Sequence, residues 1–277
     1  AGYGEAKGNI VLTDTANSVI LDGNYGYHNE NTKLSFATNH ARARKFSQKD
    51  TLYLHADTLK TLLDSDSVRL LIANKRVKFF RVDLQGLCDS MAVSQRDSVL
   101  HMYRHSIVWN ENRQISGDVI NVHYKDSTVD WATLPNYGFM VEQLGDIYFN
   151  QLKGKEMRAT FVAKELRNLN VKGNVQTLFF PQENDSTYNK FVRAESSFLN
   201  IDLKPKQEIE RIAMWPEVTG SVIPLYIAKK SQMYLDGFVW YDKFRPHTPD
   251  DIFDVDGLSQ LFETPNPSAR HVVNTQN

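Results

Sequence analysis

The strongest constraint on the fold is the alternation of apolar and polar residues in segments between Leu152 and Phe180. Met157, Ala159 and Phe161 occupy every second position, with charged or hydroxyl-bearing residues between them. A side-chain period of two places such a set on one face of a β-sheet, whereas a helix needs a period near 3.6. A second set shares one register farther along: Leu169, Val171, Val175, Thr177 and Phe179. We therefore predict closely spaced strands throughout this stretch.

The second set contains the pair Gly173-Asn174, and both residue types tolerate a positive φ. Such a pair between two extended runs is typical of a tight reversal, so we predict a strand, a turn and a further strand here. Similar pairs recur along the chain at Gly8-Asn9, Gly23-Asn24, Gly117-Asp118 and Gly220-Ser221. We expect a turn at each of them.

Asp followed by Ser or Thr is a second recurrent pair, and short polar side chains of this kind bond their own backbone at corners. The pairs are Asp50-Thr51, Asp57-Thr58, Asp66-Ser67, Asp89-Ser90, Asp97-Ser98, Asp126-Ser127 and Asp185-Ser186. Comparable units lie at 55–62, 87–94 and 116–123, at intervals of roughly 30 residues, and a period of roughly 20 to 50 residues is typical of stacked architectures. We expect a degenerate repeat of short strands.

Composition excludes several classes of protein. The formal net charge of -1 over 277 residues does not favour nucleic acid as a partner. A hydrophobic content of 41% allows a large core. The single cysteine, Cys88, excludes an internal disulfide framework and a cysteine zinc site, and we expect it to be a small buried residue. No apolar run reaches the roughly 20 residues that a transmembrane helix needs.

The chain lacks an internal linker rich in Gly, Ser or Pro. We therefore expect one continuous β domain over residues 1–253 and a polar, Pro-rich tail over residues 254–277. The start, Ala1 to Gly4, has neither the basic residues nor the apolar core of a signal peptide, and a turn and strand follow at once. We expect the chain to be a fragment with further repeats upstream.

Several pieces of the sequence resemble the OstA-like family, the relatives of the periplasmic lipopolysaccharide-transport protein LptA. The pieces are KGNV at 172–175, AKGNIVLTD at 6–14, DTLYLHADTL at 50–59, VKFFRVDLQGLCDSM at 77–91 and ISGDVINVHYKDSTVD at 115–130. They are similar to the C-terminal half of the larger OstA-like proteins of some Gram-negative bacteria. The resemblance implies an antiparallel β-jellyroll solenoid that is V-shaped and open-edged, with a role in carrying lipopolysaccharide or assembling the outer membrane.

An apolar trough along such a solenoid could bind acyl chains. Each buried methylene contributes about 0.8 kcal/mol, so a chain of about a dozen carbons gains about 10 kcal/mol before the costs of binding. The trough candidates are Leu52, Leu54, Ile120, Val122, Met157, Phe161, Leu169, Val171, Val175 and Phe179. The alternative is that these residues simply fill a core.

Cations at the rim of the trough could orient the lipid by binding its phosphates. The rim candidates are Lys75, Arg76, Lys78, Arg81, Lys153, Lys155 and Arg158. Exposed charge pairs contribute only about 0.2–1 kcal/mol each, so the affinity would come from the trough. The alternative is that these charges form a solvated strand face.

Motifs for catalysis or metal binding are weak. His101 and His105 have the spacing of a helical metal pair, but their segment is expected to be a strand, where that spacing separates them by about 13 Å. Asp254, Asp256 and Glu263 fit a calcium loop whose first position, Ile252, cannot ligate. Signatures of serine hydrolases, zinc proteases and phosphate loops are missing. We expect no enzymatic activity, no metal and no cofactor.

The sequence therefore predicts an all-β, non-enzymatic envelope protein, periplasmic or associated with the outer membrane. Its expected partners are lipopolysaccharide or lipid A, and other β-jellyroll proteins or a second copy joined by edge-strand addition. One alternative is a scaffold without a lipid ligand. Another is a carbohydrate-binding or carbohydrate-active β protein with paired carboxylates and stacking aromatics, drawn from Trp109, Trp131, Trp215, Trp240, Tyr124, Tyr137 and Tyr148.

Overall fold

The computed structural model describes residues 2–15, 18–47, 50–63, 66–94, 96–125, 128–183, 187–205 and 208–264. Over these residues the chain is all-β: every pairing between strands is antiparallel within each unit, and one short α-helix lies near the C-terminal end. Asp126-Ser127 and Asp185-Ser186, two of the predicted corners, lie outside the described residues, as does the predicted tail from residue 265 onward. No helix among the described residues is long and apolar enough to cross a membrane.

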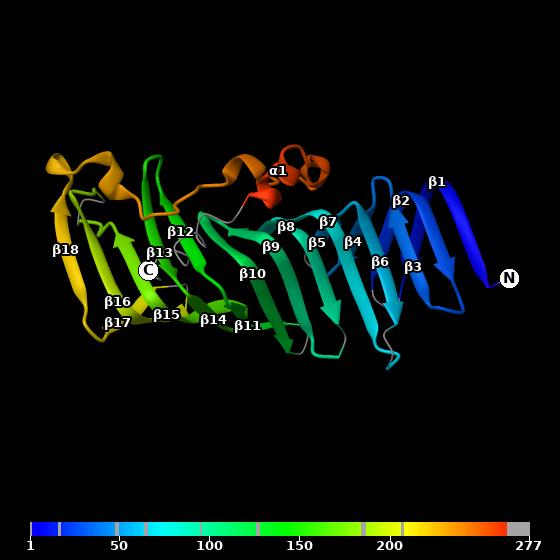
Figure 1. The fold of residues 1–277 in the computed structure, drawn as a ribbon, viewed down its shortest axis with the longest axis horizontal. Coiled ribbons are helices and arrows are strands. Elements are labelled where there is room, and N and C mark those ends of the chain that lie inside the picture. Colours follow the sequence, from blue (N-terminus) through cyan, green and yellow to red (C-terminus); the bar gives the residue numbers. More distant parts are fainter. Residues whose placement is uncertain are drawn as a thin grey trace, which may run out of the picture. The chain divides into compact units, whose positions relative to one another are not determined.

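The chain divides into two compact units, one of residues 1–111 with 241–264 and one of residues 112–240. We refer to them as unit 1 and unit 2. In Figure 1 the strands of unit 1 run from blue to green and those of unit 2 from green to yellow. Among the described residues, each unit consists of nine consecutive strands and of one segment from the irregular part of the chain that follows β18.

Unit 1 contains the first nine strands of the numbering in Figure 1. They are β1 (Tyr3–Asp14), β2 (Val19–Asn29), β3 (Leu34–Thr38), β4 (Arg42–Phe46), β5 (Thr51–His55), β6 (Thr58–Leu63), β7 (Arg69–Arg81), β8 (Leu84–Ser94) and β9 (Val99–Asn110). Its C-terminal part contains η4 (Asp242–Phe244), η5 (Pro249–Phe253) and α1 (Leu258–Glu263).

Unit 2 contains the remaining strands. They are β10 (Arg113–Lys125), β11 (Thr128–Leu134), β12 (Gly138–Leu144), β13 (Tyr148–Gly154), β14 (Glu156–Val162), β15 (Glu165–Phe179), β16 (Lys190–Leu203), β17 (Ile209–Trp215) and β18 (Thr219–Pro224). The turns η2 (Leu225–Ile227) and η3 (Lys230–Met233) follow the last strand.

The long strands of each unit take part in two ladders, one with each half of the strand. In unit 1, one ladder has the order β1-β2-β4-β5-β7-β8-β9 and the other has the order β1-β2-β3-β6-β7-β8-β9. In unit 2, ladder A has the order β10-β11-β14-β15-β16-β17 and ladder B has the order β10-β12-β13-β15-β16-β18. Each short strand belongs to one ladder only, and each long strand takes part in both ladders of its unit.

The prediction of a tight reversal at Gly173-Asn174 is wrong, because β15 continues through this pair from one ladder to the other. The two residues have φ values of 75° and 49° and form a bulge opposite β16. A bulge accommodates left-handed residues while the strand bends instead of reversing. The other Gly pairs, Gly8-Asn9, Gly23-Asn24, Gly117-Asp118 and Gly220-Ser221, likewise lie inside strands. The reversal between β14 and β15 occurs at Ala163-Lys164, with φ values of 53° and 70°.

The bulge also changes which residues face the core. Leu169, Val171 and Val175 are buried as predicted, but Leu178 is fully buried whereas Phe179 is 38% exposed. One extra residue in a strand shifts the alternation after it, as seen at Leu178 and Phe179, although Val175 directly after the bulge is buried too. The prediction that Phe179 shares the inward register of Leu169 is therefore wrong, and Leu178 holds the inward position.

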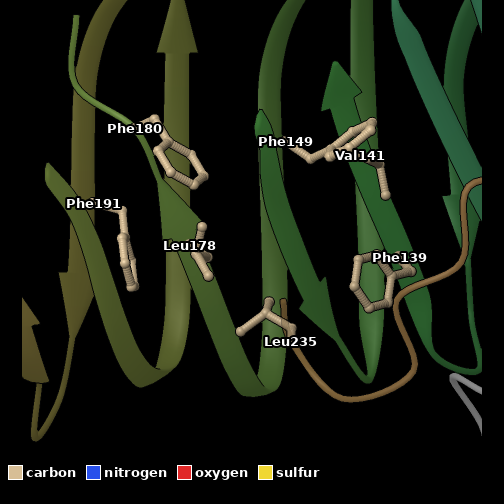
Figure 2. Close-up of a cluster of buried hydrophobic side chains, with 7 residues drawn as sticks. All are labelled: Phe139, Val141, Phe149, Leu178, Phe180, Phe191 and Leu235. Carbon is tan, nitrogen blue, oxygen red and sulfur yellow. The ribbon is translucent and has the colours of Figure 1, made fainter. Parts of the chain in front are cut away.

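A buried apolar cluster of unit 2 lies on one face of ladder B (Figure 2). It consists of Phe139, Val141, Phe149, Leu178, Phe180, Phe191 and Leu235. All but Leu235 come from the sheet strands or the residue directly after β15, and Leu235 comes from the irregular segment 225–240. We call this segment the strap of unit 2, and we call residues 241–264 the strap of unit 1.

The strap of unit 1 includes residues that the sequence placed in a loose tail. The part from residue 254 to residue 264 contains a turn and α1, and Leu258 at the start of α1 is fully buried. Ile252 in η5 is also fully buried. Pro-rich composition suggested irregular structure, and irregular segments can still be ordered when they dock apolar side chains.

Candidate functional site: an apolar sheet face and two straps

One face of ladder A carries an apolar row that crosses the sheet of unit 2. Met157 lies opposite Val171, which lies opposite Leu199, and all three are buried. The next row joins Ala159, Leu169 and Ile201 in the same way. Strand order therefore aligns the predicted trough residues of β14 and β15 on a single face.

The apolar row becomes exposed where ladder A ends. On β17, Met214 lies opposite Leu199 and Ile212 lies opposite Ile201. Leu199 is 2% exposed, whereas Ile212 is 50% exposed. The sheet thus has an apolar face whose side chains are buried on its middle strands and exposed to solvent on its last strand, β17.

The other trough candidates are distributed over both units. Leu52 and Leu54 lie on β5 of unit 1 and are half-buried, with Leu54 opposite Phe79. Ile120 is buried and Val122 half-buried on β10 of unit 2. Phe161 is half-buried near the end of β14. The structure thus groups Met157, Leu169 and Val171 on one face and leaves Leu52 and Leu54 in the other unit.

Two of the predicted rim cations lie beneath the straps. Lys78 is 2% exposed and its Nζ donates to the backbone carbonyl of Asp254 at 2.7 Å. Lys153 is half-buried and its Nζ donates to the backbone carbonyl of Asp236 at 2.9 Å. Burial lowers the pKa of both ammonium groups, because the charged form loses hydration. Each of these lysines could meet a lipid phosphate only after its strap moves.

The remaining rim candidates have several different environments. Arg76 pairs with Asp57 at 2.9 Å, and Arg81 pairs with Asp83. Arg158 lies over the ring of Trp131 at 4.3 Å, on the exposed side of ladder A. Lys75 and Lys155 are exposed. Lys155 and Arg158 are thus the unit 2 candidates that solvent reaches most freely.

Sequence reasoning missed the buried amides that hold the strap of unit 2. Gln151 is 2% exposed, and its Nε2 donates to the carbonyl of Met233 at 2.9 Å while its Oε1 accepts from the N–H of Leu235 at 2.8 Å. Gln114 is fully buried and donates to the carbonyl of Val239 at 2.9 Å. Buried amides need partners of this kind. The available signal was a Gln at an inward position of an otherwise apolar strand.

The strap of unit 1 docks through an aromatic side chain. Phe253 stacks on His40 with ring centroids 3.7 Å apart and packs against His55 at 4.9 Å. His55 is 6% exposed, and its Nδ1 donates to the carbonyl of Ala41 at 2.7 Å. Burial lowers the pKa of His55. Arg245 adds bonds from Nε and Nη2 to Oε1 of Gln85, at 3.0 Å and 2.6 Å.

The cysteine and the four tryptophans lie in separate environments among the described residues. Cys88 is fully buried, and burial raises the pKa of its thiol. Over the residues that the structure describes, no group of three or more His, Cys, Asp and Glu side chains could hold a metal ion. The tryptophans lie in separate contacts: Trp109 is fully buried, Trp131 stacks on His123, Trp215 stacks on Phe198 and Trp240 packs on Phe149.

Comparison with known proteins gives a short result. No family model and no curated protein matches this chain. Any function must therefore be argued from the faces, edges and straps described above.

Proposed function

We propose that this chain is a non-enzymatic protein of the Gram-negative cell envelope that holds the acyl chains of lipopolysaccharide against an apolar β face. The proposal includes the finer fold, an OstA-like jellyroll solenoid open at its edges, and a periplasmic or outer-membrane-associated location. The resemblance of the sequence pieces at 6–14, 50–59 and 172–175 supports both. The pattern of long strands that each join two ladders is compatible with them.

The observation that carries the proposal is the apolar row of ladder A. It runs from buried Val171 through buried Leu199 to Met214, and the parallel row ends at half-exposed Ile212. An acyl chain laid on the exposed part would gain about 0.8 kcal/mol for each methylene removed from water. Ile209, which lies opposite Leu203 on the same face and is 52% exposed, enlarges this surface.

The outer strands support an interaction with other β proteins. Among the described residues, β17 and β18 each pair with β16, and β1 pairs with β2. Strands with one free side present unpaired backbone groups that can add a further strand. Val222 on β18 and Val11 on β1 are 61% and 60% exposed. Another jellyroll protein or a second copy could pair there.

The second candidate is an envelope scaffold without a lipid ligand. It is favoured by the straps, because the strap of unit 2 already covers an apolar cluster of ladder B through Leu235 and its neighbours. In that case the exposed edges would serve protein contacts alone. Lipid binding distinguishes the two candidates.

The test is binding of fluorescently labelled lipopolysaccharide to the purified chain and to two variants of neighbouring residues on β17. Ile212→Asp places a charge on the apolar row, and Arg211→Asp changes the other face of the same strand. We expect at least about tenfold weaker binding for I212D, equivalent to losing about two methylenes of contact, and little change for R211D. Equal affinity of both variants and the parent chain would refute the proposed face.

A further inference from the structure

The strap of unit 2 covers the apolar cluster on ladder B. Phe139 and Val141 come from β12, Phe149 from β13, and Leu178 and Phe191 from β15 and β16 (Figure 2). None of these five side chains is more than 8% exposed. Four strands therefore contribute apolar side chains to one surface, and Gln151 and Lys153 of β13 lie between them on the same face.

The strap is held on this surface mainly by side chains and not by strand pairing. Its backbone meets Gln151, Gln114, Lys153 and Arg193, each of which donates to a strap carbonyl. The strap itself contains the short turns η2 and η3. A segment outside the β ladder can leave without breaking the ladder.

The strap also contacts this surface through apolar side chains, which are Leu225, Ala228, Met233, Tyr234, Leu235, Phe238 and Trp240. Leu235 inserts into the cluster, and Phe238 packs on Phe139 and Phe149 with centroid distances of 6.5 Å and 5.2 Å. Trp240 packs on Phe149 at 5.6 Å. Leu235, Phe238 and Trp240 thus occupy apolar positions of the kind that acyl chains also occupy.

Two cations beneath the strap are bonded to oxygen atoms that carry no full charge. Lys153 donates to the carbonyl of Asp236 at 2.9 Å, and Arg193 donates to the carbonyl of Gln232 at 3.3 Å. A phosphate oxygen is a stronger acceptor than a carbonyl oxygen for an ammonium or guanidinium group. Burial lowers the pKa of Lys153, and a bound anion would reverse that shift.

We propose that the strap of unit 2 is a displaceable cover over a second lipid-binding face of the protein. Acyl chains replace Leu235, Phe238 and Trp240 on the aromatic surface, and a lipid phosphate replaces the strap carbonyls at Lys153 and Arg193. This proposal rests on the proposed lipid function and adds a regulated site to it. The occupant is a lipid with an anionic phosphate head, because the surface combines an apolar area with two cations at hydrogen-bonding positions.

The test weakens the strap without altering the sheet. Phe238→Ala removes the main aromatic contact of the strap, and Phe198→Ala is its control, since Phe198 stacks on Trp215 away from the strap. Labelled lipopolysaccharide should bind F238A on the order of tenfold more tightly, because the open fraction rises, while F198A should not show this gain. In the F238A background, Lys153→Gln should weaken binding of phosphorylated lipid A but not of dephosphorylated lipid A.

Hydrogen exchange of the unmodified protein gives an independent reading. Lipopolysaccharide should accelerate exchange of the amides of 225–240, and inorganic phosphate alone should not. Unchanged protection of the strap amides, or equal lipid affinity of F238A and the parent chain, would overturn the displaceable cover. Weaker binding by I212D would in that case still support the lipid face on ladder A. Strap release by a peptide and not by lipid would assign the face to a protein partner and also overturn the proposal. Absence of lipid binding by every variant removes both proposals.

Discussion

The backbone N–H of Leu235 donates to Oε1 of Gln151 at 2.8 Å, although the two residues are 84 positions apart in the sequence. The same Gln151 amide donates to the carbonyl of Met233, so one side chain satisfies a donor and an acceptor of the strap. Both Gln151 and Leu235 are almost completely buried. The strap is therefore recognised by its backbone as well as by its apolar side chains.

Replacing this amide should destabilise unit 2. Gln151→Leu leaves the N–H of Leu235 and the carbonyl of Met233 without their partner, which costs about 1–3 kcal/mol for buried polar groups. Gln176→Leu is the control, because the amide of Gln176 bonds the exposed Glu195. Urea unfolding should show a lower midpoint for Q151L and a shift within about 0.5 kcal/mol for Q176L. Equal midpoints would contradict the role of Gln151.

Stability should depend on pH through His55. Burial lowers its pKa from 6.5, the bond to the Ala41 carbonyl and the charge of Asp57 oppose that shift, and His40 and Arg76 add to it. The unfolded state then binds the proton more readily than the folded state. The contribution of neutral His55 to folding stability is therefore fully present above about pH 6.5, and it is lost as the pH drops below that value.

The measurement is the unfolding midpoint between pH 5 and pH 8 for the parent chain and for two variants. His55→Gln should flatten the acid side of the profile, because the titrating group is gone. His28→Gln, which alters an exposed histidine bonded to Ser35, should leave the profile as it was. A parent profile with no decline in acid, or an identical decline in H55Q, would be against this assignment.

The strap of unit 1 should loosen when its aromatic anchor is removed. Phe253→Ala deletes the ring that stacks on His40 and packs on His55, and should cost about 2 kcal/mol. Hydrogen exchange should then speed up over 241–264. Phe46→Ala, which removes a ring that is 40% exposed, should leave exchange there unchanged. Strong protection of the strap in F253A would show that other contacts hold it.

The bulge of β15 should depend on glycine at position 173. Gly173 has a φ of 75°, and an added Cβ would lie 3.0 Å from the side chain of Lys155. Gly173→Ala should therefore cost about 1–2 kcal/mol. Gly4→Ala is the matched control, because a Cβ at Gly4 meets nothing within 4 Å and its φ is not positive. The measurement is the midpoint of thermal unfolding. An equal decrease of this midpoint in both variants would contradict this account.

The alternation of residue types was sufficient to predict the strands, because a period of two is a local property. It correctly grouped Met157 with Ala159 and Leu169 with Val171. It failed at the Gly173-Asn174 pair and again at Phe179, since Gly-Asn pairs occur both in reversals and in bulges, and only the pairing partner distinguishes them. Phe179 was therefore placed inward in error, and Leu178 was missed.

The straps could not be predicted from local pattern. Gln114 bonds a carbonyl 125 positions away and Lys78 bonds one 176 positions away, so neither side chain has a local signal for its partner. Lys78 was expected at the rim of the trough, and the sequence suggested no role for Gln114. A polar residue at an inward strand position is the feature that could have indicated a docked segment.

The most direct test of the lipid function is photo-crosslinking in cells from adjacent positions of β17. A benzophenone side chain at Ile212 lies on the apolar row, and one at Arg211 lies on the opposite face of the same strand. If this face holds acyl chains, position 212 captures lipopolysaccharide and position 211 does not. Capture from neither position, or from Arg211 alone, would contradict the lipid-holding face.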